Sequence, residues 1–173
     1  LTFGISPSFL KKMKLENKGL EEFKDLPPFA REQLKERYTG GDICIQACAD
    51  DEQVAFHAVR NLIRKARSTV TMKWSQSGFA AIGNRKETPR NLFGFKDGTA
   101  NATKEDQFNN IVWCDKDNWM KGGSYMAVRR IQMHLETWDR TNLNEQEHTF
   151  GRYKESGAPL GEKDEFATID LEK

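Results

Sequence analysis

One stretch of the chain, Asn91–Thr103, has residue types that could take part in chemistry. Asp97 stands between Gly94 and Gly98, with two phenylalanines before it and a threonine and an asparagine after it. Gly98 can adopt a positive φ and lets a ligand approach the backbone closely. Side chains of Asp, Thr and Asn bond to the local main chain and stabilise turns. We therefore expect a rigid loop that presents the carboxylate of Asp97.

The predicted chemistry of this loop is proton transfer. Asp97 follows Phe93 and Phe95, and in such a half-apolar setting a carboxylate can move a proton rather than remain a solvated charge. The string Lys96–Thr99 is also ordinary turn chemistry, because the same residue types are common in loops that have no function. From these residues alone, a catalytic loop and a structural turn both stay open.

The elements that must position this loop include two helices. Small and apolar residues recur at helical spacing from Val54 to Ala66, with basic residues between them, which predicts an amphipathic helix. Asp50 is the candidate N-cap of this helix, since a glutamine follows it three residues later. A second, more polar helix is expected from Thr141 through about His148.

Strands are expected from short apolar and β-branched runs. Ile43–Ala49 follows two glycines and fits a strand buried on both faces. Leu1–Ile5 fits the last strand of a unit that begins upstream, and residues 6–40 fit a linker with short helical pieces. Further strands are expected at Ser68–Ala81, Asn109–Asp115 and Ser124–Leu135. This order, without regular alternation of strand and helix, predicts an α+β fold with a largely antiparallel sheet, such as a ferredoxin-like unit.

The charge of the chain is almost balanced. Its 173 residues contain 27 Lys and Arg against 26 Asp and Glu, which leaves a net charge of +1. Such a balance does not favour a nucleic-acid partner. Charged residues make up 31% of the chain, and no apolar run approaches the roughly 18 residues that a membrane span needs. The chain begins at Leu1, and we expect it to be an internal fragment of a longer protein.

Five other residues have both a functional and a structural interpretation. His57 has no second ligand three or four residues away within its predicted helix, so a structural role is favoured over metal binding. Arg129 lies on the apolar face of a predicted strand, where it either pairs with a buried anion or belongs to a structural ion pair. Cys44, Cys48 and Cys114 are expected to be small buried hydrophobic residues, with a disulfide to Cys114 as the alternative.

The loop around Asp97 also carries a family resemblance. Gly94-Phe-Lys-Asp97-Gly98 resembles the GxxDG signature of the dye-decolorizing (DyP-type) haem peroxidases. The run Asn91–Asn101 is similar to the exported deferrochelatase/peroxidase branch of that family. Further matches follow in order at residues 41–48, 122–132, 136–141 and 150–161, so the likeness covers nearly the whole sequence.

The resemblance implies a fold and a location. In this family two ferredoxin-like units pack their sheets together in a dimeric α+β barrel, and haem lies against the second unit. Residues 1–38 are then expected to be the end of the first unit plus a linker. Residues 39–173 are expected to be an incomplete second, haem-binding unit. The family also implies export to the periplasm or the cell envelope and allows homo-oligomers.

The resemblance further implies a function. The expected activity is oxidation of dyes, phenols or ferrous iron by hydrogen peroxide, with a b-type haem as cofactor and a deferrochelatase role in iron acquisition. Asp97 matches the residue that transfers the proton of the peroxide. Gly98, Thr99 and Ala100 match residues that contact the haem, and Phe95 is expected to shape the pocket.

The sequence departs from the family pattern at the iron ligand. The family's proximal histidine and distal arginine both follow the stretch that resembles Gly157–Gly161, and neither is found before Lys173. None of His57, His134 and His148 stands where the axial ligand is expected. The isolated chain is therefore predicted to lack a haem-iron ligand. A second hypothesis follows, in which the chain is a non-catalytic module that binds haem or a protein partner.

Overall fold

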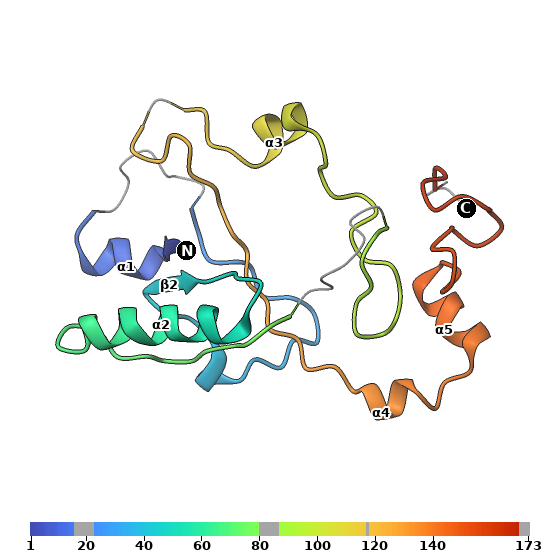
Figure 1. Ribbon diagram of the computed structural model, residues 1–173, viewed down its shortest axis with the longest axis horizontal. Coiled ribbons are helices and arrows are strands. Elements are labelled where there is room, and N and C mark those ends of the chain that lie inside the picture. The colour runs from blue at the N-terminus through green and yellow to red at the C-terminus, as the bar shows by residue number, and fades with distance from the viewer. Residues whose placement is uncertain (16–22, 80–86, 117, 170–173) are drawn as a thin grey trace. The chain divides into compact units, whose positions relative to one another are not determined.

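The computed structural model describes residues 1–15, 23–79, 87–116 and 118–169. The chain divides into two compact units, Leu1–Phe79 and Ala80–Lys173. Figure 1 shows the elements of the first unit in blue to green and those of the second in yellow to red. The assignment of residues 1–38 and 39–173 to two ferredoxin-like halves stays a prediction, whereas the compact units divide after Phe79.

The first unit contains a two-stranded antiparallel sheet. Strand β1 (Thr2–Ile5) pairs with β2 (Ile43–Gln46), in the register that places Gly4 opposite Cys44. Both strands were expected from the apolar runs at these positions, and their antiparallel pairing confirms the α+β class. Residues 6–42 separate the two strands in the sequence, so a long connection joins them in place of the tight turn of a hairpin.

The sheet is less buried than its apolar sequence predicts. Ile43 is 48% exposed and β2 ends at Gln46, so Ile43–Ala49 does not form a strand buried on both faces. Cys44 and Cys48 are exposed free thiols, and Cys114 is a partly buried one, so the predicted burial is wrong for the first two. The physical reason is that the sheet has only two strands in the described residues, and a pair of strands has no enclosed centre.

Helix α1 (Pro7–Lys12) follows β1 directly. Ser6 caps it by accepting the N–H of Phe9 at 3.3 Å, and proline suits the first helical position because its missing N–H has no partner there. Asp42 lies just before β2 and accepts the ammonium of Lys12 at 2.6 Å, which ties the end of the helix to the sheet. A short 3-10 helix, η1 (Glu36–Tyr38), precedes Asp42.

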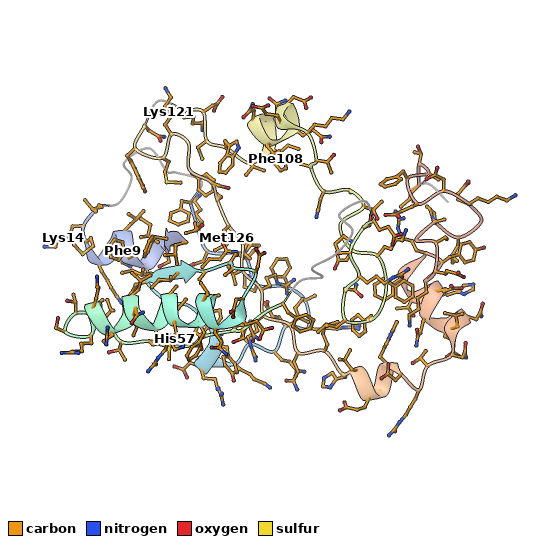
Figure 2. All side chains as sticks on the ribbon, viewed as in Figure 1. Phe9, Lys14, His57, Phe108, Lys121 and Met126 are labelled. Carbon is orange, nitrogen blue, oxygen red and sulfur yellow. The ribbon has the colours of Figure 1, made fainter. Side chains whose placement is uncertain are left out.

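Helix α2 (Glu52–Ala66) confirms the helix predicted from the apolar periodicity. Its N-cap is Asp51, whose carboxylate accepts the N–H of Gln53 at 2.7 Å, so the prediction of Asp50 as the cap is wrong by one residue. A capping side chain reaches the second or third helical N–H, and only Asp51 stands at that distance from Gln53. His57, labelled in Figure 2, is exposed on this helix. Its ring meets that of Phe56 edge-on at 5.4 Å.

The two aspartates at the start of α2 give a matched pair of variants. Asp51→Ala is expected to lower the free energy of unfolding by about 1 kcal/mol, because the N–H of Gln53 loses its acceptor. Asp50→Ala removes the same charge from the neighbouring position and is expected to change the free energy of unfolding by less than about 0.5 kcal/mol. Urea unfolding followed by far-ultraviolet circular dichroism measures both, and equal losses would contradict the assignment of the cap.

The strand predicted at Ser68–Ala81 does not form in residues 68–79, and the last two residues of the prediction lie outside the described residues. Side chains hold this stretch instead. The ammonium of Lys73 donates to the carbonyl of Thr39 at 2.6 Å, and the indole N–H of Trp74 donates to the carbonyl of Gly40 at 2.9 Å. Composition alone suited a strand, but a strand also needs a neighbouring ladder.

The strand predicted at Asn109–Asp115 does not form, because its first three residues belong to helix α3 (Glu105–Ile111) of the second unit. Gln107 explains the helix, because its side-chain oxygen accepts the N–H groups of Thr103 at 3.0 Å and Lys104 at 3.2 Å. Acidic residues in the first turn also favour a helix start. The local capping therefore overrides the apolar character of the residues that follow.

The longest predicted strand, Ser124–Leu135, does not form either: the structure describes all of these residues, and none of them is in a strand. Most of its apolar side chains are exposed, among them Ile131 and also Met126, which Figure 2 labels. Arg129 is exposed as well, so the apolar strand face on which it was expected does not form. Alternation in the sequence predicts a half-buried strand only where a partner strand is available, and none pairs with this stretch among the described residues.

Two further helices lead into the candidate site. Helix α4 (Leu135–Trp138) is a single turn, and α5 (Leu143–Phe150) matches the helix predicted from Thr141. The cap of α5 is Asn142 rather than Thr141, since the Asn142 side chain accepts the N–H of Glu145 at 3.0 Å. Gly151 ends α5 in the left-handed conformation. Within the described ranges, no helix is both long enough and apolar enough to cross a membrane.

Candidate functional site

The residues around Asp97 form a tight loop, as the sequence predicts. Arg90 and Lys96 face each other in an isolated antiparallel bridge, and the N–H of Asn91 donates to the carbonyl of Phe95 at 2.9 Å. The side-chain oxygen of Asn91 accepts the N–H of Phe93 at 3.0 Å and that of Phe95 at 3.2 Å. These bonds satisfy the backbone inside the loop, so its conformation is fixed locally.

Both glycines of the loop are required by its backbone. Gly94 has a φ of 84° and Gly98 a φ of 124°, a range in which residues with a side chain are strained. A Cβ on Gly94 would lie 2.8 Å from the side chain of Lys154, and one on Gly98 would lie 3.0 Å from the side chain of Asn101. The glycine spacing in the sequence therefore reflects both backbone conformation and close approach.

Asp97 is exposed in this loop. Its backbone N–H donates to the carbonyl of Pro89 at 2.7 Å, which fixes the main chain at the point where the carboxylate projects. Phe95, two residues earlier, is only 2% exposed. The carboxylate and the Phe95 ring therefore lie in different environments, and the ring supports the loop from within.

Four aromatic rings form the cluster that supports the loop. Phe95 stacks on Phe150 with ring centroids 4.0 Å apart and an interplanar angle of 9°. Phe93 lies 4.7 Å from Trp138, and Trp138 meets Phe150 edge-on at 5.6 Å. Phe93 and Phe95 come from the loop, Trp138 from α4 and Phe150 from α5, so the cluster joins three segments of the second unit. Aromatic pairs of this geometry add to the stabilisation from area burial.

Polar contacts tie the same loop to the segment after α5. The guanidinium of Arg90 donates to the carbonyl of Gly94 at 2.8 Å within the loop. It also donates to the carbonyls of Lys154 at 2.5 Å and Glu155 at 2.9 Å, beyond α5. Lys154 in turn donates to the side chain of Gln146 at 2.8 Å. A planar guanidinium with five donors is suited to binding several carbonyls in this way.

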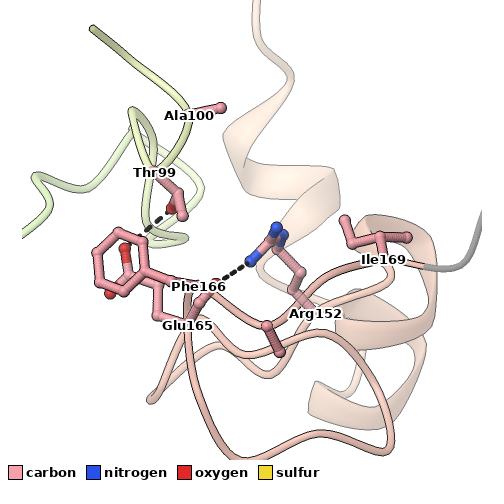
Figure 3. Close-up of a pocket in the computed structure, with 7 residues that line it drawn as sticks. Thr99, Ala100, Arg152, Glu165, Phe166 and Ile169 are labelled. Carbon is pink, nitrogen blue, oxygen red and sulfur yellow. Dashed lines mark hydrogen bonds between the residues drawn. The ribbon is translucent and has the colours of Figure 1, made fainter.

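A pocket of about 330 Å³ lies beside the loop (Figure 3). Two of the predicted site residues, Thr99 and Ala100, are on its wall. The remaining wall comes from the segment after α5 and consists of Arg152, Glu165, Phe166, Ala167 and Ile169. Asp97 and Gly98 directly precede Thr99 in the chain, but they are not among these lining residues, and neither is Phe95.

Glu165 is the residue of this pocket that the sequence did not single out. Its carboxylate accepts the ammonium of Lys96 at 2.5 Å and the hydroxyl of Thr99 at 2.9 Å, and it also accepts the hydroxyl of Thr88. Burial raises the pKa of Glu165, but the hydrogen bonds from Lys96, Thr88 and Thr99 and the Lys96 charge lower it further, so the net pKa lies below its usual value. The three donors are 66 to 77 residues away in the sequence, so no local pattern could have indicated them.

None of the chain's three histidines is a lining residue of this pocket. His57 and His134 are exposed, and the ring of His148 contacts the carbonyl of Asn144 on its own helix at 2.7 Å. In the part of the chain that the structure describes, no group of three or more His, Cys, Asp or Glu side chains is arranged to hold a metal ion.

Fold and site together define a class of protein: an α+β chain in which a glycine-bracketed acidic loop flanks a small, largely apolar pocket. Comparison with family descriptions identifies the class. Residues 1–80 match the description "Dyp-type peroxidase, N-terminal", and residues 88–171 match "Dyp-type peroxidase, C-terminal". The chain belongs to the Dyp-type peroxidase family.

Individual relatives agree with this assignment. The deferrochelatase of Escherichia coli (strain K12) is 38% identical over 97% of this chain and 40% of its own length. The crystal structure of a DyP-type peroxidase from Streptomyces coelicolor superimposes with a TM-score of 0.88 at 37% identity, covering 99% of this chain and 48% of that one. The structure of ferric DtpA from Streptomyces lividans superimposes with a TM-score of 0.87 at 37% identity, covering 99% of this chain and 49% of that one. The chain thus spans less than half the length of these relatives.

The pocket fits haem, the cofactor that the family implies, along one side only. Ala100, Phe166 and Ile169 offer apolar surface suited to a porphyrin face, and Arg152 brings a guanidinium that could meet a propionate. Its volume of about 330 Å³ is at the lower end of the range for ligand pockets. Since no histidine lines it, the described residues suit the ring of the cofactor and do not supply its iron ligand.

Proposed function

We propose that the chain is part of a haem-dependent peroxidase and contributes the side of the active site that carries Asp97. The observation that carries the proposal is the loop itself. Its backbone is fixed by internal bonds and by two glycines at positive φ, it projects the Asp97 carboxylate outward, and it continues directly into Thr99 and Ala100 on the pocket wall. Membership of the Dyp-type peroxidase family supports the same activity.

In this proposal the residues of the chain position and move a proton. Haem, when bound, supplies the iron redox chemistry. Asp97 would accept a proton from one oxygen of hydrogen peroxide and deliver it to the other, and this second oxygen would leave as water once the bound haem supplies the two electrons that cleave the oxygen–oxygen bond. Such a positioned acid and base typically contributes about 10²- to 10⁴-fold to a rate. Gly98 would let the backbone approach the ring closely, and Thr99 and Ala100 would contact the ring, while Phe95 supports the loop by stacking on Phe150.

We extend the proposal to the reducing substrate, the location and the domain organisation of the protein. The reducing substrate is a dye or phenol or ferrous iron, and the similarity to proteins named deferrochelatase supports a role in iron acquisition. The same branch supports export to the periplasm or the cell envelope. Residues 39–173 form part of the haem-binding, ferredoxin-like half, with residues 1–38 as the end of the first half, and the complete protein is able to form homo-oligomers.

A second candidate is a non-catalytic module that binds haem or a protein partner. One observation favours it: none of the chain's three histidines lines the pocket, so the pocket itself offers no imidazole for the iron. A module of this kind would bind the cofactor without turnover, or would not bind it at all.

One experiment separates the two candidates. The full-length natural polypeptide and the 173-residue chain are each titrated with haem, and their Soret absorbance and peroxide-dependent oxidation of guaiacol are measured. We expect a ligated Soret band and turnover from the full-length polypeptide and no ligated band from the shorter chain. A Soret band without turnover in the full-length polypeptide supports the binding module, and a ligated band from the shorter chain would show that one of its own side chains binds the iron.

A further inference from the structure

Glu165 receives three side-chain donors from one region of the sequence. Its carboxylate accepts the ammonium of Lys96 at 2.5 Å, the hydroxyl of Thr99 at 2.9 Å and the hydroxyl of Thr88. The side chain of Glu165 is 9% exposed and that of Lys96 is 17% exposed, so this ion pair is largely removed from water. Hydrogen bonds of this charge-assisted kind are stronger than neutral ones.

Each of these donors lies within two residues of Asp97 or next to its backbone acceptor. Lys96 immediately precedes Asp97 in the chain, and Thr99 follows it by two residues. Thr88 precedes Pro89, whose carbonyl accepts the N–H of Asp97 at 2.7 Å. The carboxylate of Glu165 therefore holds both sides of the Asp97 turn and also the residue beside its backbone acceptor.

The backbone of Glu165 is itself held in place. Its carbonyl accepts from the guanidinium of Arg152 at 3.0 Å, and the same guanidinium donates to the carbonyl of Gly157 at 2.5 Å (Figure 3 shows the first of these bonds). Gly157 has a φ of 77°, and a Cβ there would lie 2.6 Å from the side chain of Lys96 and 3.3 Å from that of Glu165. The side chains of Lys96 and Glu165 therefore pack directly against the backbone of Gly157, which restricts their movement.

We propose that Glu165 is a positioning residue for the peroxidase reaction: it sets the direction of the Asp97 carboxylate by binding Lys96, Thr99 and Thr88. This inference rests on the proposed function of Asp97 and assigns to Glu165 a role in orientation rather than in proton transfer. Orientation matters because a displacement of about 1 Å in a reacting group can cost about 10²-fold in rate.

The ionised form of Glu165 is the one that positions the loop. The ammonium of Lys96 faces its carboxylate and the guanidinium of Arg152 its backbone carbonyl. Burial raises its pKa, but the hydrogen bonds from Lys96, Thr88 and Thr99 outweigh burial and hold the pKa below its usual value. A carboxylate with a lowered pKa stabilises the fold fully above the pKa of the unfolded chain. That stabilisation is lost as the pH falls through the lower, folded pKa. The loop should therefore be held firmly at neutral pH and loosen only in acid.

The test is Glu165→Gln in the full-length haem-loaded polypeptide, with Glu162→Gln as the matched control. Glu162 is an exposed acid three residues away in the same segment. Hydrogen exchange of the Asp97 and Asn101 amides reports on the turn, since these donate to the carbonyls of Pro89 and Gly98. Stopped-flow mixing gives the rate of reaction with peroxide, and steady-state assays give KM for the reducing substrate.

We expect Glu165→Gln to speed exchange of these two amides by at least about tenfold and to slow the peroxide reaction by about 10- to 100-fold, with KM for the reductant unchanged. Glu162→Gln should change neither. Thr88→Val, which removes one donor only, should give a smaller effect in the same direction and serves if Glu165→Gln folds poorly. Two results would overturn the proposal. One is exchange of the Asp97 and Asn101 amides within about twofold of wild type in both Glu165→Gln and Thr88→Val. The other is exchange of the α2 amides accelerated as much as that of the Asp97 and Asn101 amides.

Lowering the pH provides a further check. Protection of the wild-type Asp97 amide, taken relative to the intrinsic exchange rate at each pH, should fall toward that of Glu165→Gln as Glu165 becomes protonated, and the two proteins should converge in acid. Because hydrogen exchange needs no turnover, it can be measured in the haem-free protein as well. If Asp97→Asn reacts with peroxide at the wild-type rate, the proposed function fails, while the exchange data still decide whether Glu165 fixes the turn.

Discussion

Replacing Asp97 by asparagine in the full-length haem-loaded polypeptide is expected to slow its reaction with hydrogen peroxide by about 10²- to 10⁴-fold. Asparagine has nearly the same size and shape as aspartate, so it keeps the turn and the bond from the Asp97 N–H to Pro89. It cannot accept and return a proton in the way that a carboxylate does. The loss should therefore fall on the chemical step and leave haem binding intact.

The measurement combines two signals. Soret absorbance shows that the Asp97→Asn protein still holds haem, and stopped-flow mixing gives its second-order rate with peroxide. Asp106→Asn is the control, because Asp106 is an exposed aspartate on α3 and its replacement removes the same charge. A rate for Asp97→Asn within about threefold of wild type, with haem bound, would exclude Asp97 as the group that transfers the proton.

The second large effect concerns the aromatic cluster beneath the loop. Phe95→Ala is expected to lower the free energy of unfolding by about 3–4 kcal/mol, because Phe95 is 2% exposed and its ring stacks on Phe150 at 4.0 Å. Removal of the ring leaves a cavity between Phe93, Trp138 and Phe150. These rings come from three different segments, so they cannot all move inward to fill it. Since the cluster supports the residues just before Asp97, the same change should also reduce the peroxide reaction.

Urea unfolding followed by tryptophan fluorescence measures this loss, because Trp138 lies in the cluster at 6.3 Å from Phe95. Phe56→Ala is the control: Phe56 is 58% exposed on α2, and its removal should change the free energy of unfolding by less than about 0.5 kcal/mol. Phe95→Leu, which keeps much of the volume, should cost less than Phe95→Ala. Equal losses for Phe95→Ala and Phe56→Ala would show that the cluster does not stabilise the fold.

Local signals in the sequence predicted the local features well. The apolar periodicity of residues 54–66 indicated α2, because one face of a helix recurs every three to four residues whatever surrounds it. The glycines that bracket Asp97 indicated its loop, since a positive φ is a local requirement. Both features depend only on neighbours within a few positions.

The features that the sequence missed depend on distant partners. Ser124–Leu135 alternates like a strand, yet a ladder needs a second strand beside it, and the pattern of one segment does not say whether one is present. Glu165 was missed for the same reason, because its donors come from residues 88–99 and nothing in the acidic segment around it indicates them. Phe95 was expected to shape the pocket, and its place in the ring stack likewise required knowledge of α4 and α5.

The guanidinium of Arg90 joins the loop to the carbonyls of residues 154 and 155, so the two segments cannot separate without breaking several bonds at once. Regions linked in this way open together as one cooperative block. A protease would accordingly meet this part of the chain either fully closed or fully open. Sites of cleavage at Lys96 and at Lys154 should appear with the same time course.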